Sequence, residues 1–530
     1  MIMFFARPLF FLFLLFCTAV PALADIKIFI TNDVHGHVAD NPEKKRIGYA
    51  RLKALADDAR AEGHTVFILD AGDAFSGSAY AQKDKGRSVA KLMGQVGYRV
   101  LTPGNHAFDY AASEGPLHYS NELLRLVREN SPGKVDAVAE NLTYKGANTP
   151  GMLTEPVVIH DETSENEHGL RVIVTGVITP YAVKPGMRHV LEDYDFDLKP
   201  TAEDTKKAIL ERLKHSLAPY DRAEDIVIVL SHLGHAGPQG DRDGRITGPD
   251  VAAVPHVDFV ADGHSHQAVA PSRQYGAIYA NGGRYLEHVM EITLDGKGGD
   301  MALKSYDDVA DVVPDRGMAE RIRQLDAAWG FAEVLFTSPD DSVFSDRRLR
   351  KDSTPLGRLI CEGMAKATGS AVALHNPGGI RAGLPGGPVR LRDLHDVLPF
   401  GDTLVTADMT GRQIAGILMR GAGHGGRGLP QFYGLTAWAW RDGEGTLHVA
   451  GFRLADGEPL QPDRTYRVAL NGFMARNMDL PTKKDHGTLV DVLEKQLKKG
   501  VDAEALRSGQ NLYVFADRSA AEAAWQAGIR

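Results

Sequence analysis

Five short clusters of Asp, Asn, His and Gly constrain this chain more than any other feature of its sequence. The clusters are Thr31–Gly36, Asp70–Asp73, Gly104–Asp109, Ser231–Gly234 and Asp262–His266, and four of the five begin where a short apolar run ends. In an α/β sheet the carboxyl ends of strands lie along one edge, where ligands bind. Segments far apart in the sequence can therefore converge on a single site.

The apolar runs alternate with longer segments of helical periodicity, which predicts an α/β domain over residues 25–313. The strand-like runs are Ile26–Ile30, Val66–Leu69, Val172–Val177, Ile226–Leu230 and Val257–Ala261, and helix-like stretches are Ile47–Glu62 and Gly86–Val96. A polar, helix-prone linker or hinge follows at 314–336. A second α/β unit is expected over 337–530, with strand-like Ala371–Leu374, Leu404–Ala407, Thr436–Trp440 and Tyr466–Leu470 and a loop at Gly421–Gly428.

The first 24 residues have the composition of an export signal. Arg7 supplies a positive charge, the apolar run Leu9–Val20 follows, and Ala22–Ala24 gives the small-residue pattern that signal peptidase cleaves. The run is short for the roughly 20 residues of a membrane span. We therefore expect a secreted or periplasmic protein without a stable membrane anchor. Its mature form keeps Cys361 but loses Cys17, so no intramolecular disulfide can form.

The residue types in the clusters indicate a two-metal phosphoesterase. Asp, Asn and His bind divalent metals, and without paired cysteines a thiolate site is excluded. Seven candidate ligands suit two ions that share a bridging carboxylate, so that a metal-activated water attacks phosphorus.

Each cluster taken alone has a simpler explanation. His35 or His232 could be an ordinary turn histidine, Asp33 and Asp73 could cap helices, and the glycines could only form turns. Five such clusters in order, most of them after a strand, favour the metal site.

These motifs resemble those of the calcineurin-like metallophosphoesterases, and specifically the bacterial periplasmic and animal ecto-5'-nucleotidases. The resemblance implies a first metal site of Asp33, His35, Asp73 and His266. It implies a second site of Asp73, Asn105, His232 and His264, with Asp73 bridging. It also assigns His106 and Asp109 as a catalytic pair, although Ala107 stands where the family usually has Glu.

The second half of the chain resembles the nucleoside-binding domain of the same family. The resembling motifs are Leu356–Leu359, Asn376–Arg381, Leu398–Asp402 and Phe473–Asp479. By this resemblance Arg350 and Arg381 meet the phosphate, with Arg347 a weaker candidate, and Phe400 and Phe473 sandwich the base. Asn376, Asp402 and Asp479 belong to the same pocket, where Asp479 can accept hydrogen bonds from ribose. Pro377, Asp402 and Met478 depart from the usual family pattern.

The resemblance implies an N-terminal four-layer α/β/β/α domain, a C-terminal α/β substrate domain and an active site in the cleft between them. The expected reaction is hydrolysis of nucleoside 5'-phosphates to nucleoside and phosphate. The alternatives are a 2',3'-cyclic nucleotide phosphodiesterase, a nucleotide-sugar hydrolase, a sulfur-ester hydrolase on the same scaffold, or a periplasmic nucleotide-binding or metal-binding protein without turnover.

The sequence leaves the metal open among Zn, Mn, Co and Fe, and it does not set the base, the number of phosphates or the oligomeric state. The partner is expected to be a small nucleotide. The net charge of −9 provides no broad basic surface for long nucleic acids.

Overall fold

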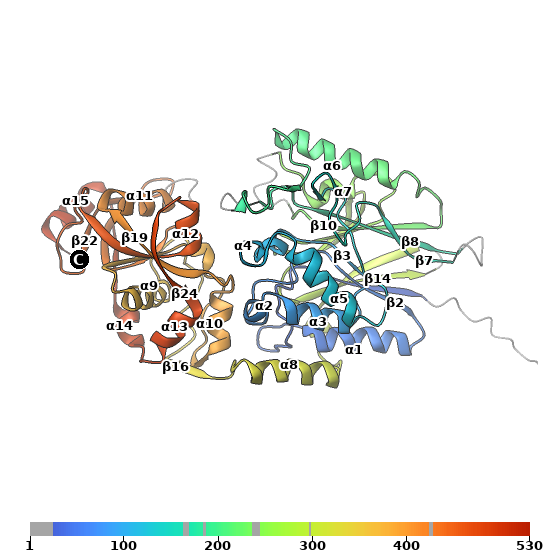
Figure 1. Ribbon diagram of the computed structural model, residues 1–530, viewed down its shortest axis with the longest axis horizontal. Coiled ribbons are helices and arrows are strands. Elements are labelled where there is room, and N and C mark those ends of the chain that lie inside the picture. The colour runs from blue at the N-terminus through green and yellow to red at the C-terminus, as the bar shows by residue number, and fades with distance from the viewer. Residues whose placement is uncertain are drawn as a thin grey trace, which may run out of the picture.

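The computed structural model describes residues 25–162, 169–183, 187–235, 244–295, 298–422 and 428–529. The chain forms two lobes, an N-terminal one in blue to yellow-green and a C-terminal one in orange to red (Figure 1). The predicted signal segment 1–24 lies outside the described residues, as does most of the predicted loop 421–428.

Two mixed β-sheets form the centre of the N-terminal lobe. As far as the structure describes them, the first sheet has antiparallel pairs at one end and parallel pairs at the other. The second has parallel strands in its middle and an antiparallel strand at each edge. The first has the order β15 (Gly298–Ser305), β14 (His288–Asp295), β1 (Ile26–Thr31), β2 (Thr65–Asp70), β3 (Val100–Leu101), β4 (Asp136–Ala137). The second has the order β12 (Ala268–Tyr275), β13 (Ala277–Gly282), β11 (Phe259–Asp262), β10 (Asp225–His232), β8 (Arg171–Ile178), β7 (Val157–Asp161).

The two sheets pack face to face, and helices cover their outer faces. Ile28 of β1 and Ile228 of β10 belong to one buried apolar cluster between the sheets. Helices α1 (Gly48–Ala61), α3 (Arg87–Val96) and α5 (Leu124–Asn130) lie on one outer side, and α6 (Ala202–Leu217) and α7 (Gly248–Ala252) lie on the other (Figure 1). This is the expected four-layer α/β/β/α arrangement.

Shorter elements surround these layers. Helices α2 (Ala79–Asp84) and α4 (Ala111–Glu114) lie on the side of the lobe that faces the C-terminal lobe (Figure 1). Strands β6 (Ala147–Asn148), β5 (Thr143–Tyr144) and β9 (Tyr194–Asp195) form a small sheet.

The apolar runs of the N-terminal half are strands, as predicted. They correspond to β1, β2, β8, β10 and β11, and the predicted helices correspond to α1 and α3. The two-residue strand β3 was not expected from the sequence. It pairs in parallel with β2 and places the Gly104–Asp109 cluster at the same sheet edge as the others.

The C-terminal lobe is a second α/β unit. Its main sheet has the order β20 (Gln431–Tyr433), β17 (Val372–His375), β23 (Thr465–Asn471), β19 (Thr403–Thr410), β24 (Thr482–Thr488). Smaller sheets join β16 (Val334–Ser338) to β18 (Gly387–Arg390), and β21 (Leu435–Arg441) to β22 (Leu447–Leu454) and β25 (Leu512–Phe515). The helices are α9 (Pro355–Thr368), α10 (Leu391–Val397), α11 (Gly411–Ala422), α12 (Gly472–Asn477), α13 (Leu489–Leu497), α14 (Ala503–Ser508) and α15 (Arg518–Ala527).

Helix α8 (Arg316–Ala328) falls within the predicted linker and runs along the base of the N-terminal lobe (Figure 1). Its Asp315 N-cap donates its backbone N–H to Ala50 O of α1 at 2.9 Å, and Met318 and Ile322 are buried. Most of the linker is therefore fixed on the N-terminal lobe. The chain crosses to the other lobe between α8 and β16.

None of the helices in the described ranges combines the length and the apolar character that crossing a bilayer requires. Cys361 is buried in α9 as a free thiol, and burial raises the pKa of that thiol well above its usual range.

Candidate functional site

The predicted ligands converge at one edge of the two sheets. Asp33 and His35 follow β1, and Asp73 follows β2. From the second sheet, His232 is the last residue of β10, while His264 and His266 follow β11. The site is thus built from both sheets, and its complete set of side chains comes together only when they are packed together.

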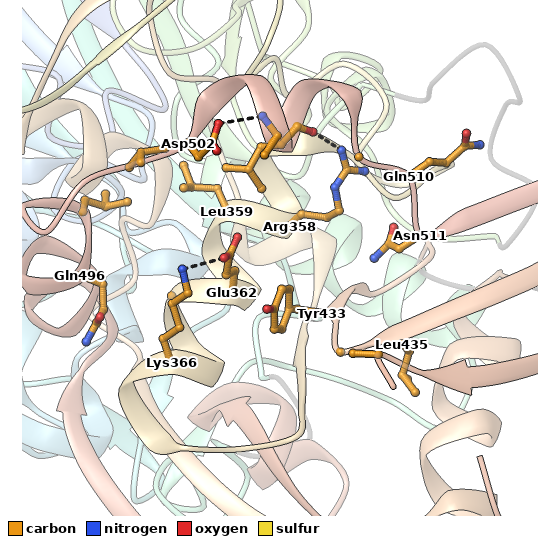
Figure 2. Close-up of a pocket in the computed structure, with 18 of the residues that line it drawn as sticks. Arg358, Leu359, Glu362, Lys366, Tyr433, Leu435, Gln496, Asp502, Gln510 and Asn511 are labelled. Carbon is orange, nitrogen blue, oxygen red and sulfur yellow. Dashed lines mark hydrogen bonds and ion pairs between the residues drawn. The ribbon is translucent and has the colours of Figure 1, made fainter. Parts of the chain in front are cut away.

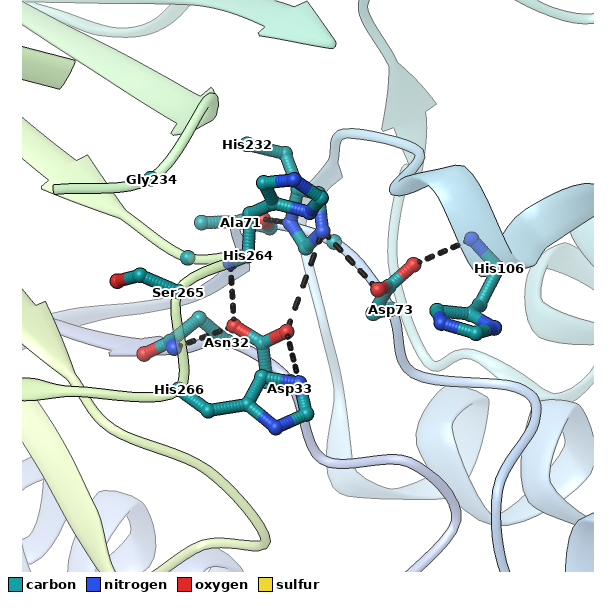
Figure 3. A network of polar contacts seen from close by, with 12 residues as sticks. Asn32, Asp33, Ala71, Asp73, His106, His232, Gly234, His264, Ser265 and His266 are labelled. Atoms are coloured by element: carbon teal, nitrogen blue, oxygen red, sulfur yellow. Dashed lines mark hydrogen bonds and ion pairs between the residues drawn. The ribbon is translucent and has the colours of Figure 1, made fainter. Parts of the chain in front are cut away.

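Two carboxylates lie at the centre of this cluster (Figure 3). Asp73 Oδ2 is 3.0 Å from His232 Nε2 and 3.8 Å from His35 Nε2. Asp33 Oδ1 is 3.2 Å from His266 Nε2 and 3.9 Å from His232 Nε2. The Nε2 atoms of His35 and His266 are 3.1 Å apart. These spacings bring lone-pair donors from several segments to one point.

Backbone carbonyls orient the two most buried histidines. His35 Nδ1 is 2.9 Å from Ser76 O, and His232 Nδ1 is 2.7 Å from Ala71 O. A proton on Nδ1 of each ring satisfies these carbonyls and directs each Nε2 atom at the carboxylates. Such outer hydrogen bonds are the usual way in which a protein fixes the tautomer of a metal-binding histidine.

Several buried polar atoms in the cluster have no hydrogen-bond partner within the described residues. They include Asp33 Oδ1, Asn105 Oδ1 and His232 Nε2. An unpaired buried acceptor costs about 1–3 kcal/mol, and three at one place point to a missing ligand. Three overlapping sets of side chains could each hold an ion, namely Asp33 with His35 and His266, Asp33 with Asp73 and His232, and His35 with Asp73 and His106. This donor set fits divalent cations.

The protonation of the cluster also suits a cation. Burial opposes ionisation of Asp73, but His232 and His106 outweigh it and hold the pKa of Asp73 well below its usual range. Burial lowers the pKa of His35 to about 3 and that of His264 to about 4. At neutral pH these groups are therefore an anion and two neutral imidazoles. Burial opposes protonation of His232, but Asp73 and Asp33 outweigh it and raise the pKa of His232 to about 10, so this ring holds a proton that a bound cation would replace.

His106 is held between a carboxylate of the cluster and one of its own turn. Its backbone N–H donates to Asp73 Oδ1 at 2.8 Å, and its Nδ1 lies 2.5 Å from Asp109 Oδ2. Asp109 therefore fixes the ring through Nδ1. One ring nitrogen of His106 also lies close to His35 and Asp73, so the geometry allows it either to hold a proton or to bind an ion.

The remaining two predicted ligands lie beside the cluster rather than at its centre. The ring centroid of His264 is 5.3 Å from that of His232, and its backbone N–H donates to Asp33 Oδ2 at 2.8 Å. Asn105 begins the turn that carries His106, and its Oδ1 is buried. The preceding Gly104 is required because a Cβ there would lie 2.0 Å from Asp73 Oδ1.

On the C-terminal side, the structure places Phe400 directly against His106. The two rings are stacked, with centroids 5.8 Å apart and planes inclined by 12°. The Arg381 guanidinium, from the same lobe, lies over the Phe400 ring, 5.7 Å from its centroid. A predicted base-binding residue thus lies next to the predicted catalytic pair.

Asp402, Asn376 and Phe473 form one hydrogen-bonded group nearby. Asp402 accepts the backbone N–H of Phe473 at 3.0 Å, and Asn471 Nδ2 donates to both Asp402 and Asn376 at 2.7 Å. The Asp402 carboxylate therefore holds the turn that carries Phe473. Asp479 is exposed at the end of the same segment with φ of +50°.

Arg350, Arg347 and Arg381 line a cavity of about 350 Å³ together with Lys351 and Asp346. Arg284 of the N-terminal lobe lines it as well. Sequence reasoning missed Arg284. Its signal was its position two residues after β13, at the same sheet edge as the metal-binding clusters.

Two family models match this chain. Residues 26–268 match the family model described as calcineurin-like phosphoesterase, and residues 329–483 match the 5'-nucleotidase C-terminal domain. The protein UshA of Yersinia enterocolitica is 26% identical over 534 residues, which cover 91% of this chain and 90% of that protein.

Two further relatives match about nine-tenths of this chain. The trifunctional nucleotide phosphoesterase YfkN of Bacillus subtilis is 27% identical over 90% of this chain, but the match spans only 34% of that protein. The 5'-nucleotidase of Vibrio cholerae is 24% identical, with 91% of this chain and 89% of that protein covered.

Among solved structures, the 5'-nucleotidase precursor of Thermus thermophilus has a TM-score of 0.65 at 23% identity, covering 93% of this chain and all of that one. The sulfate thiohydrolase SoxB of Thermus thermophilus has a TM-score of 0.65 at 16% identity, covering 94% and 98%. These likenesses show the shared two-domain fold.

Proposed function

Because the chain belongs to the calcineurin-like phosphoesterases that carry a 5'-nucleotidase C-terminal domain, and is thus a metal-dependent phosphoester hydrolase, we propose that it hydrolyses nucleoside 5'-phosphates. The products are a nucleoside and inorganic phosphate. The observation that carries this proposal is the stacking of Phe400 on His106. It joins an aromatic, arginine-containing surface of one domain to the carboxylate–histidine cluster of the other.

Two divalent ions are proposed, held by Asp33, His35, Asp73 and His266 and by Asp73, Asn105, His232 and His264. When bound, such ions polarise the phosphoryl oxygens and lower the pKa of a water molecule. The protein's own side chains do the rest. His35 and His232 are held by Ser76 O and Ala71 O, which fixes their Nε2 atoms.

His106 is proposed to stabilise the charge that develops on the phosphoryl group. Asp109 holds the ring through Nδ1 and so fixes its orientation. The ring then offers its other nitrogen to the substrate. A cation next to a transferring phosphoryl group lowers the barrier most when it is already in place.

The substrate pocket is proposed to use both lobes. Arg350 and Arg381, with their planar guanidinium groups, are suited to bidentate phosphate contacts. Phe400 and Phe473 offer ring faces to a nucleobase, with a stacking contribution of about 1–3 kcal/mol per base. The positions of Asn376 and Asp402 support a role in holding the Phe473 turn rather than in touching the base.

We propose that the protein is exported and that residues 1–24 are removed. The proposed domains are residues 25–313 and 337–530. The proposed metal is one of Zn, Mn, Co and Fe. The substrate is a small nucleotide. The fold alone does not choose the reaction, since SoxB, a sulfate thiohydrolase, shares it.

The test is phosphate release from AMP by the mature protein, with and without added Mn²⁺ or Zn²⁺, compared with UDP-glucose, 2',3'-cAMP and bis(p-nitrophenyl) phosphate. Metal-dependent release from AMP supports the proposal. Turnover of a diester without release from AMP moves the substrate to a cyclic nucleotide or nucleotide sugar. Binding of AMP without turnover of any ester would leave a nucleotide-binding protein.

A further inference from the structure

A second pocket lies within the C-terminal lobe and shares no lining residue with the cleft described above. It is bounded by α9, α13 and α14 on one side and by β20 and β21 on the other (Figure 2). Its volume is about 380 Å³, within the range of small-molecule sites. None of the residues expected from the sequence to bind metal or nucleotide lines it.

Arg358 is the feature that sets this pocket apart. It projects from the second turn of α9, and only 8% of the residue is exposed. Its guanidinium donates to Leu506 O at the other side of the pocket, which is its one hydrogen bond within the described part of the chain. A guanidinium offers five N–H donors, so most of its hydrogen-bonding capacity is not used by the protein.

The acidic groups that line the pocket are engaged elsewhere. Glu362 pairs with Lys366 at 2.7 Å, and Asp502 accepts the backbone N–H of Ala505 at 2.9 Å as the cap of α14. Within the described residues, no ion pair joins either carboxylate to Arg358. Burial lowers the pKa of Arg358, and the Tyr513 phenol opposes this shift. A buried cation without an anionic partner is costly, which is why such charges are normally paired.

The remaining walls are partly apolar. Leu359, Leu435 and Leu497 are buried side chains of the lining, and Tyr433 is half-buried beside them, while Thr436, Gln496, Gln510 and Asn511 add polar groups. The pocket therefore combines one positive charge that neither lining carboxylate pairs with, and a partly apolar wall. A single charge matches a monoanion better than a phosphate dianion, and the planar fork of a guanidinium matches a carboxylate.

We propose that this pocket binds a small organic carboxylate, whose oxygens accept hydrogen bonds from the Arg358 guanidinium and whose apolar part packs against Leu359 and Leu435. The bound carboxylate supplies the anionic partner that the protein itself does not provide. This site is independent of the reaction proposed above, because its residues lie outside the catalytic cleft.

The test is calorimetric titration of the full mature protein with benzoate, and with benzamide as its neutral isostere. Benzoate is expected to bind saturably, and benzamide at least tenfold more weakly. Arg358→Gln is expected to weaken benzoate binding at least tenfold. Ala505→Leu narrows the pocket from an exposed helix position and leaves the guanidinium in place, so it too is expected to weaken binding.

Ala523→Leu, a matched change at an exposed position on α15, is the control and is expected to bind benzoate like the unmodified protein. Should Arg358→Gln fail to fold by circular dichroism, the Ala505→Leu comparison decides alone. The proposal is overturned if no saturable benzoate binding occurs, if benzamide binds equally well, or if Ala505→Leu binds benzoate as tightly as the control.

Discussion

Five of the proposed metal ligands have a backbone conformation that non-glycine residues seldom adopt. The φ angles of Asp33, His35, Asp73, His264 and His266 lie between +46° and +70°. Each left-handed residue costs about 1–2 kcal/mol, and such strain persists where the surroundings fix it. Here the strain turns successive side chains towards one point. The residue types were readable from the sequence, whereas this conformation was not.

At the same scale, we expect His106→Ala to lower kcat for AMP roughly 10²–10⁴-fold, the usual contribution of a positioned proton-holding group. Metal content by mass spectrometry should stay unchanged, because the proposed ligands remain. His448→Ala, at an exposed strand position of the C-terminal lobe, is the control. If instead the metal content falls in proportion to activity, His106 is a ligand and not a catalytic residue.

Glu140 gives a prediction for the pH dependence of stability. Its carboxylate is fully buried and accepts from Thr175 at 2.5 Å and Ser216 at 2.7 Å, and burial raises its pKa to about 7. Between the unfolded pKa of 4.5 and this value, the folded protein holds a proton that the unfolded chain releases. The free energy of unfolding therefore falls as pH rises through this window.

Glu140→Gln removes this pH-dependent contribution. The free energy of unfolding of the variant minus that of the original protein should therefore rise by about 3 kcal/mol from pH 4.5 to pH 8. Urea unfolding at several pH values measures the difference. Glu203→Gln, at an exposed position, is the control, and its difference in free energy of unfolding from the original protein should not change with pH. A flat difference for Glu140→Gln would mean that this carboxyl ionises as readily as an exposed one.

At the scale of elements, strand length decided what could be predicted. The apolar runs of β1, β2, β8, β10 and β11 are four or more residues long and were recognised as strands. β3 has two residues, and its pairing with β2 depends on a neighbour more than 30 residues away. Local pattern cannot report such a contact. The same limit applies to Arg284, whose place in the cleft depends on how the two lobes meet.

The loop that carries Arg350 is held by one buried side chain of β20. Gln431 is fully buried, donates to Leu349 O at 2.8 Å and Asp352 O at 2.7 Å, and accepts the backbone N–H of Thr354 at 2.9 Å. It thus satisfies three backbone groups of the 349–354 segment. No motif around Gln431 in the sequence indicated this role.

We expect Gln431→Leu to destabilise the protein by at least about 2 kcal/mol, because three buried backbone groups lose their partner. The loosened Arg350 loop should raise KM for AMP more than it lowers kcat. Urea denaturation and steady-state kinetics measure the two effects. Gln324→Leu on the exposed face of α8 is the control. An equal loss of stability in both variants would argue against the role of Gln431 in holding the 349–354 segment.

At the scale of the whole molecule, the contact between the lobes is partly apolar. Phe331 is 1% exposed, with its ring 5.5 Å from that of Tyr80 in α2 and 5.5 Å from that of His395 in α10. Gln82 of α2 also lies 2.6 Å from His395. The hinge proposed for 314–336 would have to turn in the short segment after α8, and a rotation of the lobes would break these contacts.

A cross-link tests whether turnover needs that rotation. In an Asp326→Cys, Arg392→Cys variant, at a partly exposed ion pair between α8 and α10, a short bifunctional maleimide with a cleavable disulfide should join the lobes, while the buried Cys361 stays unmodified. If rotation is required, the cross-linked protein loses most of its AMP turnover and regains it on reduction. Each single-cysteine variant treated alike is the control. Full turnover by the cross-linked protein would rule out a required rotation.

The origin of the metal cluster in both sheets has a consequence for when an ion can enter. Its side chains come from the ends of β1, β2 and β3 of one sheet and of β10 and β11 of the other, so the complete set of donors comes together only once the sandwich has closed. His35, Asp73 and His106 belong to the first sheet alone, so we expect the complete two-ion site, rather than every ion contact, to form late. The metal bound is then determined by the ions available in the compartment where the chain completes folding. A protein refolded in vitro therefore contains the metal supplied in the buffer rather than the metal it binds in the cell.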